Sequence, residues 1–382
     1  MPERVIVLGG GIIGLACAFE AASGGALVSV IEPGAFGGQA SGAAAGMLAP
    51  YTENPEQPDP FFHLCQDSLR RYPAWVKRVE SISGMDAELL HTGSLTVAMH
   101  EADVLPLQTR IAWQRAQGAE AELVGPEMLS RLEPELSAQA VAALYCPGES
   151  HINAPKLVAA LEAACRKLGV ALLAHAGEID APRIGGASGS GISVSTSGHG
   201  IVKGDTLIVC TGAWACYYAE TFGFPIPIHP IRGQICSFNA PPPARVNHMV
   251  FSSQAYWVGK QNGSLVCGAS EDVAGYDSSV TGRGIDRLVR WGPRLFPFLQ
   301  GLEPASKWAG LRPATRDGLP LIGPVPGRPD IILAAGHYRN GILLSPVTAS
   351  IVADLLNGRT PGTPIARFAP ERFAPATSRS AR

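Results

Sequence analysis

Hydrophobic residues near the N-terminus form two short runs that flank a longer stretch of small apolar residues. The runs at 5–8 and 27–31 are rich in β-branched residues, and the stretch at 15–22 lies between them. Runs of this length predict buried strands, and the intervening stretch predicts a helix. Apolar runs at 170–174, 204–210 and 331–335 have the same character. They predict further buried strands of the parallel type.

A different pattern occupies the rest of the chain. Alternating apolar and polar residues predict strands of an antiparallel sheet, with proline and glycine in the turns. These segments are 234–238, 255–259 and 264–268, with another strand within 89–98 and a Gly/Ser-rich surface hairpin at 185–200. Helical spacing predicts helices at 61–81, 101–117, 156–168, 286–296 and 346–356, the third of them capped by Asn153.

The first strand leads directly into a glycine fingerprint. Gly9, Gly11 and Gly14 follow the spacing Gly-x-Gly-x-x-Gly between a predicted strand and a predicted helix, and Glu32 ends the next strand. In this context the glycines permit a tight turn, close approach of a pyrophosphate, and close packing of helix on strand. A carboxylate at Glu32 suits a ribose 2′-hydroxyl and disfavours the 2′-phosphate of NADP. The pattern therefore predicts a bound dinucleotide.

The two patterns alternate along the chain and predict two interleaved domains. The expected fold class is α/β, with a Rossmann-like dinucleotide-binding domain interrupted by an α+β substrate domain built on an antiparallel sheet. The 382 residues suffice for both. We expect the first domain at 1–85, 146–222 and 305–365, the second at 86–145 and 223–304, and a frayed tail at 366–382.

Composition narrows the class of protein. The chain is 46% hydrophobic and 16% charged, with a net charge of −2, which offers no attraction to nucleic acid or to an anionic membrane. The first strand begins almost at once, so we expect no signal peptide, and no uninterrupted apolar run predicts a transmembrane segment. The eight cysteines are scattered without metal-type spacing. We expect a cytoplasmic protein with no metal site.

Small residues also dominate the loop at 33–48, which contains Ser41 and Gly46. A flexible linker is one interpretation. However, a predicted helix follows at 61–81, so the loop lies inside a domain, and its glycines permit close approach to a flat ligand. We favour a loop that lines the cofactor. The turn from Thr211 to Trp214 follows a buried strand in the same way.

With these motifs, the chain resembles the D-amino-acid oxidase superfamily of FAD flavoproteins, and most closely its glycine oxidase branch. The resemblance extends over about residues 3–358. Its most specific parts are Arg312-Pro-Ala-Thr-Arg-Asp317-Gly and Gly336-His-Tyr-Arg-Asn-Gly341-Ile-Leu-Leu. It implies FAD as the cofactor, bound non-covalently, because the anchoring cysteine of sarcosine oxidases is absent from 313–315.

The resemblance also implies a set of FAD-binding residues. The backbone N–H groups of Gly341, Ile342 and Leu343 would face the flavin, and Glu178 would meet the adenine through its backbone. His337 is interpreted as structural rather than as a base. The complete set is Gly9, Gly11, Ile12, Ile13, Gly14, Glu32, Ser41, Ala44, Ala45, Gly46, Met47, Glu178, Thr211, Gly212, Trp214, Arg312, His337, Arg339, Asn340, Gly341, Ile342 and Leu343.

Three residues are implied to act on the substrate. Arg312 would clamp the carboxylate and Tyr256 would donate a second bond to it, the alternatives being a surface salt bridge and a core tyrosine. Arg339 would meet the substrate amine through its carbonyl, while its side chain either gates the entrance or is a solvated charge. Glu271 departs from the apolar residue that the branch carries, and is either an acid near the amine or a solvent-facing strand end.

The implied activity is oxidative deamination of glycine and other small amines or D-amino acids. Hydride would pass from Cα to flavin N5, and O2 would be the acceptor, giving 2-oxo acid, ammonia and hydrogen peroxide. The glycine imine would supply thiamine thiazole synthesis, with thiazole synthase as a partner, and we expect a homo-oligomer. The alternatives are a D-amino-acid or glycine dehydrogenase that uses a carrier or partner, including a hydrogen-cyanide-synthase-like subunit, and a flavin-binding subunit without turnover.

Overall fold

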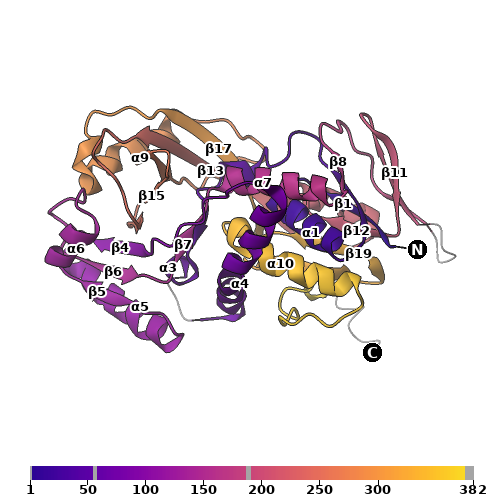
Figure 1. Ribbon diagram of the computed structural model, residues 1–382, viewed down its shortest axis with the longest axis horizontal. Coiled ribbons are helices and arrows are strands. Elements are labelled where there is room, and N and C mark those ends of the chain that lie inside the picture. The colour runs from indigo at the N-terminus through magenta and orange to yellow at the C-terminus, as the bar shows by residue number, and fades with distance from the viewer. Residues whose placement is uncertain (1, 55–57, 186–190, 375–382) are drawn as a thin grey trace.

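The computed structural model describes residues 2–54, 58–185 and 191–374. Two sheets lie at opposite ends of an elongated molecule, and helices pack between and around them (Figure 1). No helix in the described ranges is long and apolar enough to cross a membrane.

The six-stranded sheet is built from the apolar runs and is parallel except at one edge. Its order is β18 (Leu321–Val325), β19 (Arg328–Ala335), β12 (Thr206–Val209), β1 (Arg4–Leu8), β2 (Leu27–Ile31) and β8 (Ala171–Leu173). Only β18 runs antiparallel, against β19. The predicted strand at 27–31 has the predicted bounds, and the others differ by a few residues at their ends.

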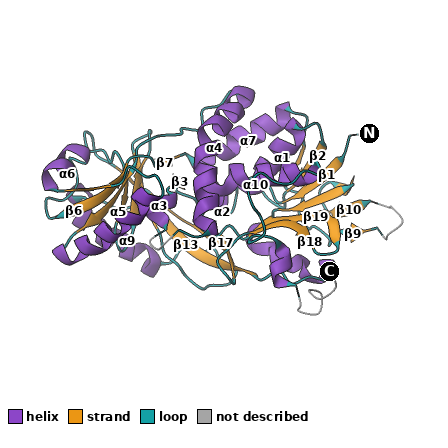
Figure 2. Ribbon diagram, turned by 90° about the horizontal axis from the view of Figure 1, so that it is seen from below, coloured by secondary structure: helices purple, strands orange, loops and turns teal. Residues whose placement is uncertain are grey.

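Alternation along β1 assigns each side chain to one face of this sheet. Val5 and Val7 join the core beneath the helices, while Ile6 and Leu8 join the core on the opposite face. Figure 2 shows the helices that cover the first face on one side of the strands. These are α1 (Ile12–Ser23), α4 (Pro60–Ser83), α7 (Ala154–Lys167) and α10 (Gly341–Leu356).

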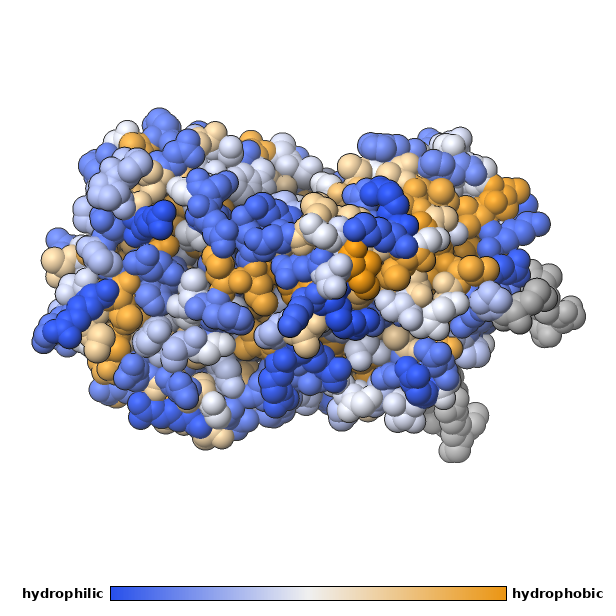
Figure 3. Space-filling view, viewed as in Figure 1, coloured by the Kyte–Doolittle hydropathy of each residue, from blue (hydrophilic) through white to orange (hydrophobic). Residues whose placement is uncertain are grey.

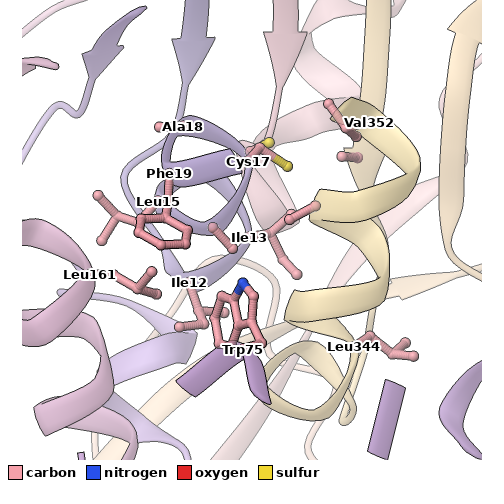
Figure 4. Packing of buried hydrophobic residues seen from close by; sticks show 14 of the residues in the cluster. Ile12, Ile13, Leu15, Cys17, Ala18, Phe19, Trp75, Leu161, Leu344 and Val352 are labelled. Atoms are coloured by element: carbon pink, nitrogen blue, oxygen red, sulfur yellow. The ribbon is translucent and has the colours of Figure 1, made fainter. Parts of the chain in front are cut away.

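The core under these helices is formed almost entirely by small and aliphatic side chains. Ile12 of α1 lies beside Trp75 of α4, and Ile13 and Leu344 of α10 belong to the same buried cluster (Figure 4). Trp75 packs edge-on against Phe19, with its Nε1 donating to Glu20. Close packing of this kind holds the start of α1 in a fixed position relative to the strand before it.

The opposite face of the six-stranded sheet is covered by a small antiparallel sheet. It consists of β9 (Arg183–Ile184), β10 (Ile192–Thr196) and β11 (Gly200–Gly204), followed in the chain by η2 (Gly212–Tyr218) and α8 (Ala219–Phe222). The predicted hairpin at 185–200 is thus displaced toward the C-terminus, and residues 186–190 lie outside the described ranges.

The second sheet has eight strands, antiparallel except where β14 meets β4. Its order is β17 (Ser306–Thr315), β13 (Ile228–Asn239), β16 (Ser264–Gly268), β15 (Tyr256–Gly259), β14 (Met249–Phe251), β4 (Ser94–Ala98), β6 (Ala142–Cys146) and β5 (Glu122–Val124). It packs with α5 (Val104–Ala116), α6 (Pro126–Leu132), α9 (Gly282–Leu295) and η3 (Pro297–Leu299), and η1 (Glu101–Asp103) leads into α5.

Short elements connect the two sheets. β3 (Met47–Leu48) lies between α2 (Ala40–Ala43) and α3 (Pro50–Glu53) in the chain. It pairs with β7 (Ser150–His151), which lies just before α7. Asn153 caps α7 by accepting from the N–H of Lys156, as predicted. The predicted fold class, a Rossmann-like part interleaved with an α+β part on an antiparallel sheet, is confirmed.

Two local predictions were wrong, and one strand was not predicted. Residues 308–315, for which the sequence predicted no strand, belong to β17 of the eight-stranded sheet. Helix α10 begins at Gly341, not at 346. Pro346 has no N–H, so the carbonyl of Ile342 has no partner inside the helix at that position and accepts from the hydroxyl of Tyr72 instead. Residues 366–374, expected to fray, include η4 (Pro370–Phe373) and the buried Phe368; 375–382 lie outside the described ranges.

The surface is mixed in character. Figure 3 shows hydrophilic residues over most of one face, with smaller hydrophobic areas between them. This agrees with the modest charged fraction of the chain.

Candidate functional site

A cavity of about 720 Å³ joins the two sheets. On one side it is lined by residues that follow the carboxyl ends of β1, β2, β12 and β19. On the other side it is lined by residues of β13, β15 and β17 in the eight-stranded sheet. Open α/β sheets bind their ligands at the carboxyl ends of the strands. The cavity therefore lies where a dinucleotide would reach across to a substrate.

The glycine fingerprint forms the turn between β1 and α1. Gly9 has φ +99°, and a Cβ there would lie 2.4 Å from the carbonyl oxygen of Cys210. A Cβ on Gly14 would lie 1.9 Å from the carbonyl oxygen of Gly9. Side chains at these two positions would push the turn away from β12 and the helix away from the turn. The start of α1 thus faces the cavity, where Ile12 and Ile13 line it.

Glu32 closes this turn from the neighbouring strand. Its carboxylate accepts from the N–H of Gly10 at 2.7 Å and from the N–H of Gly34 at 3.1 Å. Each oxygen retains a second lone pair, and the residue lines the cavity. The carboxylate is therefore held in place and still able to accept hydrogen bonds from a ligand.

The small-residue loop lines the cavity between the two sheets. Ser41 Oγ accepts from the N–H of Ile12 at 2.9 Å, which ties the loop to the first turn of α1. Gly46 has φ +82°, and a Cβ there would lie 1.9 Å from the carbonyl oxygen of Ile152. Lys260 donates to the carbonyls of Ala45 and Ile152 at 2.7 and 3.2 Å. Burial lowers the pKa of Lys260 to about 8.

Lys260→Met should weaken FAD binding about tenfold, because it removes the donors that hold the Ala45 carbonyl and leaves that loop free to move. The dissociation constant of FAD for the apoprotein measures the effect. Lys167→Met is the matched control, since Lys167 also donates to a backbone carbonyl, that of Ser83, and does not line the cavity. Equal FAD affinities in the two variants would contradict a role for Lys260 in holding the loop.

The end of β12 contributes Thr211, Gly212 and Trp214 to the lining. The Oγ1 atom of Thr211 is buried, and no group in the described ranges hydrogen-bonds to it. A buried hydroxyl without a partner costs free energy. A polar ligand in the cavity would supply the missing partner.

Helix α10 begins at the cavity. Its first N–H groups have no intrahelical acceptor and carry the positive end of the helix dipole. Ser68 and Tyr72 of α4 donate to the carbonyls of Leu343 and Ile342 at 2.6 and 2.8 Å, which fixes this first turn. Gly341 and Ile342 line the cavity, while Leu343 lies behind them.

His337 lies below this turn and is almost completely buried. One ring nitrogen is 3.0 Å from Thr348 Oγ1, and burial lowers the pKa of the imidazole to about 3. The side chain is therefore neutral at physiological pH and is held by the helix. This agrees with its interpretation as structural.

We expect acid to destabilise the protein partly through His337. The unfolded imidazole binds a proton below its ordinary pKa of about 6.5, while the folded one binds it only near 3. The contribution of the neutral His337 to the free energy of unfolding is therefore complete above pH 6.5. As the pH falls from 6.5 toward 3, the free energy of unfolding decreases by up to about 1.4 kcal/mol per pH unit. The urea midpoint of His337→Gln should accordingly fall less steeply with acid than that of the parent. Parallel curves would contradict this assignment.

The other end of the cavity carries Arg312 and Tyr256. The guanidinium of Arg312 lies over Gly233, where a Cβ would be 2.3 Å from Cζ, and its Nη1 donates to the Ser270 carbonyl at 2.9 Å. The hydroxyl of Tyr256 lies over Gly268, where a Cβ would be 2.3 Å away. Burial raises the pKa of Tyr256 to about 12, so its hydroxyl remains a donor.

A buried carboxylate lies at the same end. Glu53, at the end of α3, lines the cavity and is bonded to Arg339 at 3.2 Å. Burial raises the pKa of Glu53, while Arg339 and Arg312 oppose the shift. Two cations, one buried acid and one buried phenol thus surround a space suited to a small zwitterion.

Comparison with known proteins agrees with this geometry. The model of the family described as FAD dependent oxidoreductase matches residues 4–355. This chain belongs to that family. It is 32% identical over 365 residues to the glycine oxidase of Geobacillus kaustophilus, covering 95% of each chain, and 30% identical to that of Pseudomonas aeruginosa, covering 97% and 99%.

Further relatives extend this comparison. The bifunctional protein ThiO/ThiG of Synechocystis is 32% identical over 98% of this chain, which spans 54% of that protein. The crystal structure of glycine oxidase from Geobacillus kaustophilus superposes with a TM-score of 0.90 at 31% identity, covering 98% of this chain and 100% of that one.

The cavity fits the FAD of this oxidoreductase family. Gly9 and Gly14 allow the turn and helix α1 to pack closely, which brings the start of α1 to the cavity, and Glu32 retains acceptors for a ribose. Thr211 Oγ1 has no hydrogen-bond partner among the described residues, and the start of α10 offers N–H groups. These features suit a long ligand with hydroxyls at one end and an electron-rich ring at the other.

Most residues predicted to bind FAD line this one cavity. The lining contains Gly9, Gly11, Ile12, Ile13, Glu32, Ser41, Ala44, Ala45, Gly46, Met47, Thr211, Gly212, Trp214, Arg312, His337, Arg339, Gly341 and Ile342, together with Tyr256. Gly14, Asn340, Leu343 and Glu178 are not among the lining residues. The backbone N–H of Glu178 donates to Ser197 Oγ, and its carbonyl accepts from the N–H of Ser197, while its neighbour Ile179 lines the cavity.

The sequence reasoning did not identify Glu53. The residue ends a helix of four residues without hydrophobic periodicity, and its partner Arg339 is far away in the chain. The one available signal was an acidic residue shortly after the small-residue loop. Glu271 is half-exposed and outside the lining, which favours the solvent-facing alternative, and its carboxylate contacts Arg339.

Proposed function

We propose that this FAD-dependent oxidoreductase oxidises glycine and other small amino acids, with O2 as electron acceptor. The proposal rests mainly on Arg312, a guanidinium in the cavity wall beside a buried tyrosine, which is a site for one small carboxylate. The similarity to glycine oxidases over nearly the whole chain supports it.

FAD would be held along the glycine turn, Glu32, the loop at 41–47, Thr211 and the start of α10. When bound, it supplies the capacity to accept a hydride from carbon. The part of the chain around the six-stranded sheet would bind this cofactor, and the eight-stranded sheet would present the substrate residues. The attachment is non-covalent, in keeping with the absence of cysteine at 313–315.

The chain's own residues orient the amino acid and adjust its charge. Arg312 donates two parallel hydrogen bonds to the carboxylate, and Tyr256 donates to the same group. Their position at one end of the cavity directs Cα toward the cofactor. Glu53, whose pKa is raised by burial, takes the proton that the ammonium must lose before oxidation. The imine product then hydrolyses to 2-oxo acid and ammonia.

The deciding experiment is anaerobic bleaching of the bound flavin with glycine, N-methylglycine and D-alanine, followed by a peroxide assay in air. We expect bleaching with glycine and stoichiometric peroxide. Bleaching without peroxide would make the protein a dehydrogenase that uses a carrier. If none of the amino acids bleached the flavin, a binding subunit without turnover would replace the proposal.

We also propose thiazole synthase as a partner that consumes the glycine imine, because the Synechocystis relative is named as a ThiO/ThiG fusion. A cytoplasmic location is in keeping with eight unpaired cysteines. A homo-oligomer remains our expectation, and light scattering of the purified protein would test it.

A further inference from the structure

Arg339 lies between two carboxylates at the mouth of the cavity. Its Nη2 is 3.2 Å from Oε1 of Glu53, which is 7% exposed, and its Nη1 is 3.3 Å from Oε1 of Glu271, which is 50% exposed. The guanidinium itself lines the cavity. The charge of Arg339 is therefore neutralised by the buried Glu53 inside the cavity and by the half-exposed Glu271 at its rim.

The segment that carries Glu271 touches both arginines of the site. The carbonyl of Ser270 accepts from Arg312, and the carboxylate of Glu271 accepts from Arg339 and from the hydroxyl of Tyr338 at 3.0 Å. Glu271 is therefore positioned by several contacts at the rim. Glu271 does not line the cavity, but its two partners Tyr338 and Arg339 do, and Arg339 is the charged one of the two.

Among the described residues, the four charged side chains that meet at this end of the cavity and its rim sum to zero. Arg312 and Arg339 contribute two positive charges, and Glu53 and Glu271 contribute two negative ones. An amino acid with one carboxylate and one ammonium is itself neutral and leaves this balance intact. A second anionic group on the amine would need Arg339 as its partner, and Arg339 already has two.

We propose that Glu271 determines specificity by neutralising Arg339, so that the cavity rejects amino acids whose amine carries a second anionic group. This inference rests on the proposed amino-acid oxidation. Glu271 acts as a positioning residue through Arg339. Removing its charge leaves Arg339 with surplus positive charge at the mouth of the cavity, which a second carboxylate would neutralise.

N-methylglycine and iminodiacetate test this directly, because they differ by one carboxylate on the amine substituent. In Glu271→Gln we expect the ratio of kcat/KM for iminodiacetate to that for N-methylglycine to rise about fivefold. A factor of this size corresponds to the strongest contribution that an exposed ion pair makes. The change should lie in KM. Glu271→Asp, which keeps the charge, should retain the parental ratio. Glu127→Gln, at an exposed ion pair on α6, is the matched control.

Binding of malonate and acetate to the FAD-loaded protein provides a second measurement that needs no turnover. Calorimetry should show that the ratio of malonate affinity to acetate affinity is about fivefold higher in Glu271→Gln than in the parent. An unchanged ratio of malonate to acetate affinity would overturn the inference, whatever the activity. Failure of the parent to oxidise N-methylglycine or glycine would instead count against the proposed function, while the malonate ratio would still decide the role of Glu271.

Discussion

Arg312→Ala should leave FAD bound and lower kcat/KM for glycine roughly 30- to 5000-fold. This corresponds to about 2–5 kcal/mol for removing one partner of a buried charge pair. The guanidinium rests on Gly233 and is oriented by the Ser270 carbonyl, so it is held in place for a carboxylate. Arg339, the other arginine of the lining, is already paired with Glu53 and Glu271.

Arg312→Lys should recover only part of this loss, because an ammonium cannot form two parallel bonds to a carboxylate. A simple amine without a carboxylate should be oxidised equally by the parent and by both variants. Arg131→Ala, which removes an exposed arginine from α6, is the control. Near-normal kcat/KM for glycine in Arg312→Ala would place the carboxylate contact elsewhere.

Glu32→Ala should raise the dissociation constant of FAD about a hundredfold or more. The carboxylate is proposed to accept two ribose hydrogen bonds, each worth about 1.5–3 kcal/mol. It also holds the N–H groups of Gly10 and Gly34, so its loss loosens the turn over the cofactor. Equilibrium titration of apoprotein with FAD gives the value.

Glu162→Ala provides the comparison for Glu32, since Glu162 is a carboxylate in an ion pair on α7 and does not line the cavity. Glu32→Ala saturated with FAD should have the same circular dichroism as the parent, which separates weaker binding from misfolding. FAD affinity equal to that of the control would make Glu32 an ordinary charge at the end of a strand.

Several elements could be predicted because local pattern alone specifies them. The run at 27–31 and the segment at 264–268 have the predicted bounds. Both are short, mostly apolar segments flanked by turns. The glycine turn was predictable for the same reason. Its conformation depends on residues that are neighbours in the chain, and glycine is the residue that permits it.

Strand β17 shows where local pattern misleads. Its residues include Pro313 and Gly310, which ordinarily argue against a strand. β17 lies at the edge of the eight-stranded sheet, and it pairs with β13 along ten residues, with Pro313 opposite Pro230. An edge strand tolerates a missing N–H, so the long-range pairing outweighs the local preference.

The sequence by itself determined that a dinucleotide binds after the first strand and, by resemblance, that this is FAD in a two-part α/β fold. It could not determine which charges meet around the substrate. Glu53, Glu271 and Arg339 come from three distant segments, α3, the loop after β16 and the turn before α10. Electrostatic pairs of this kind depend on distance in space, which the packing of the two sheets sets and which no local spacing encodes.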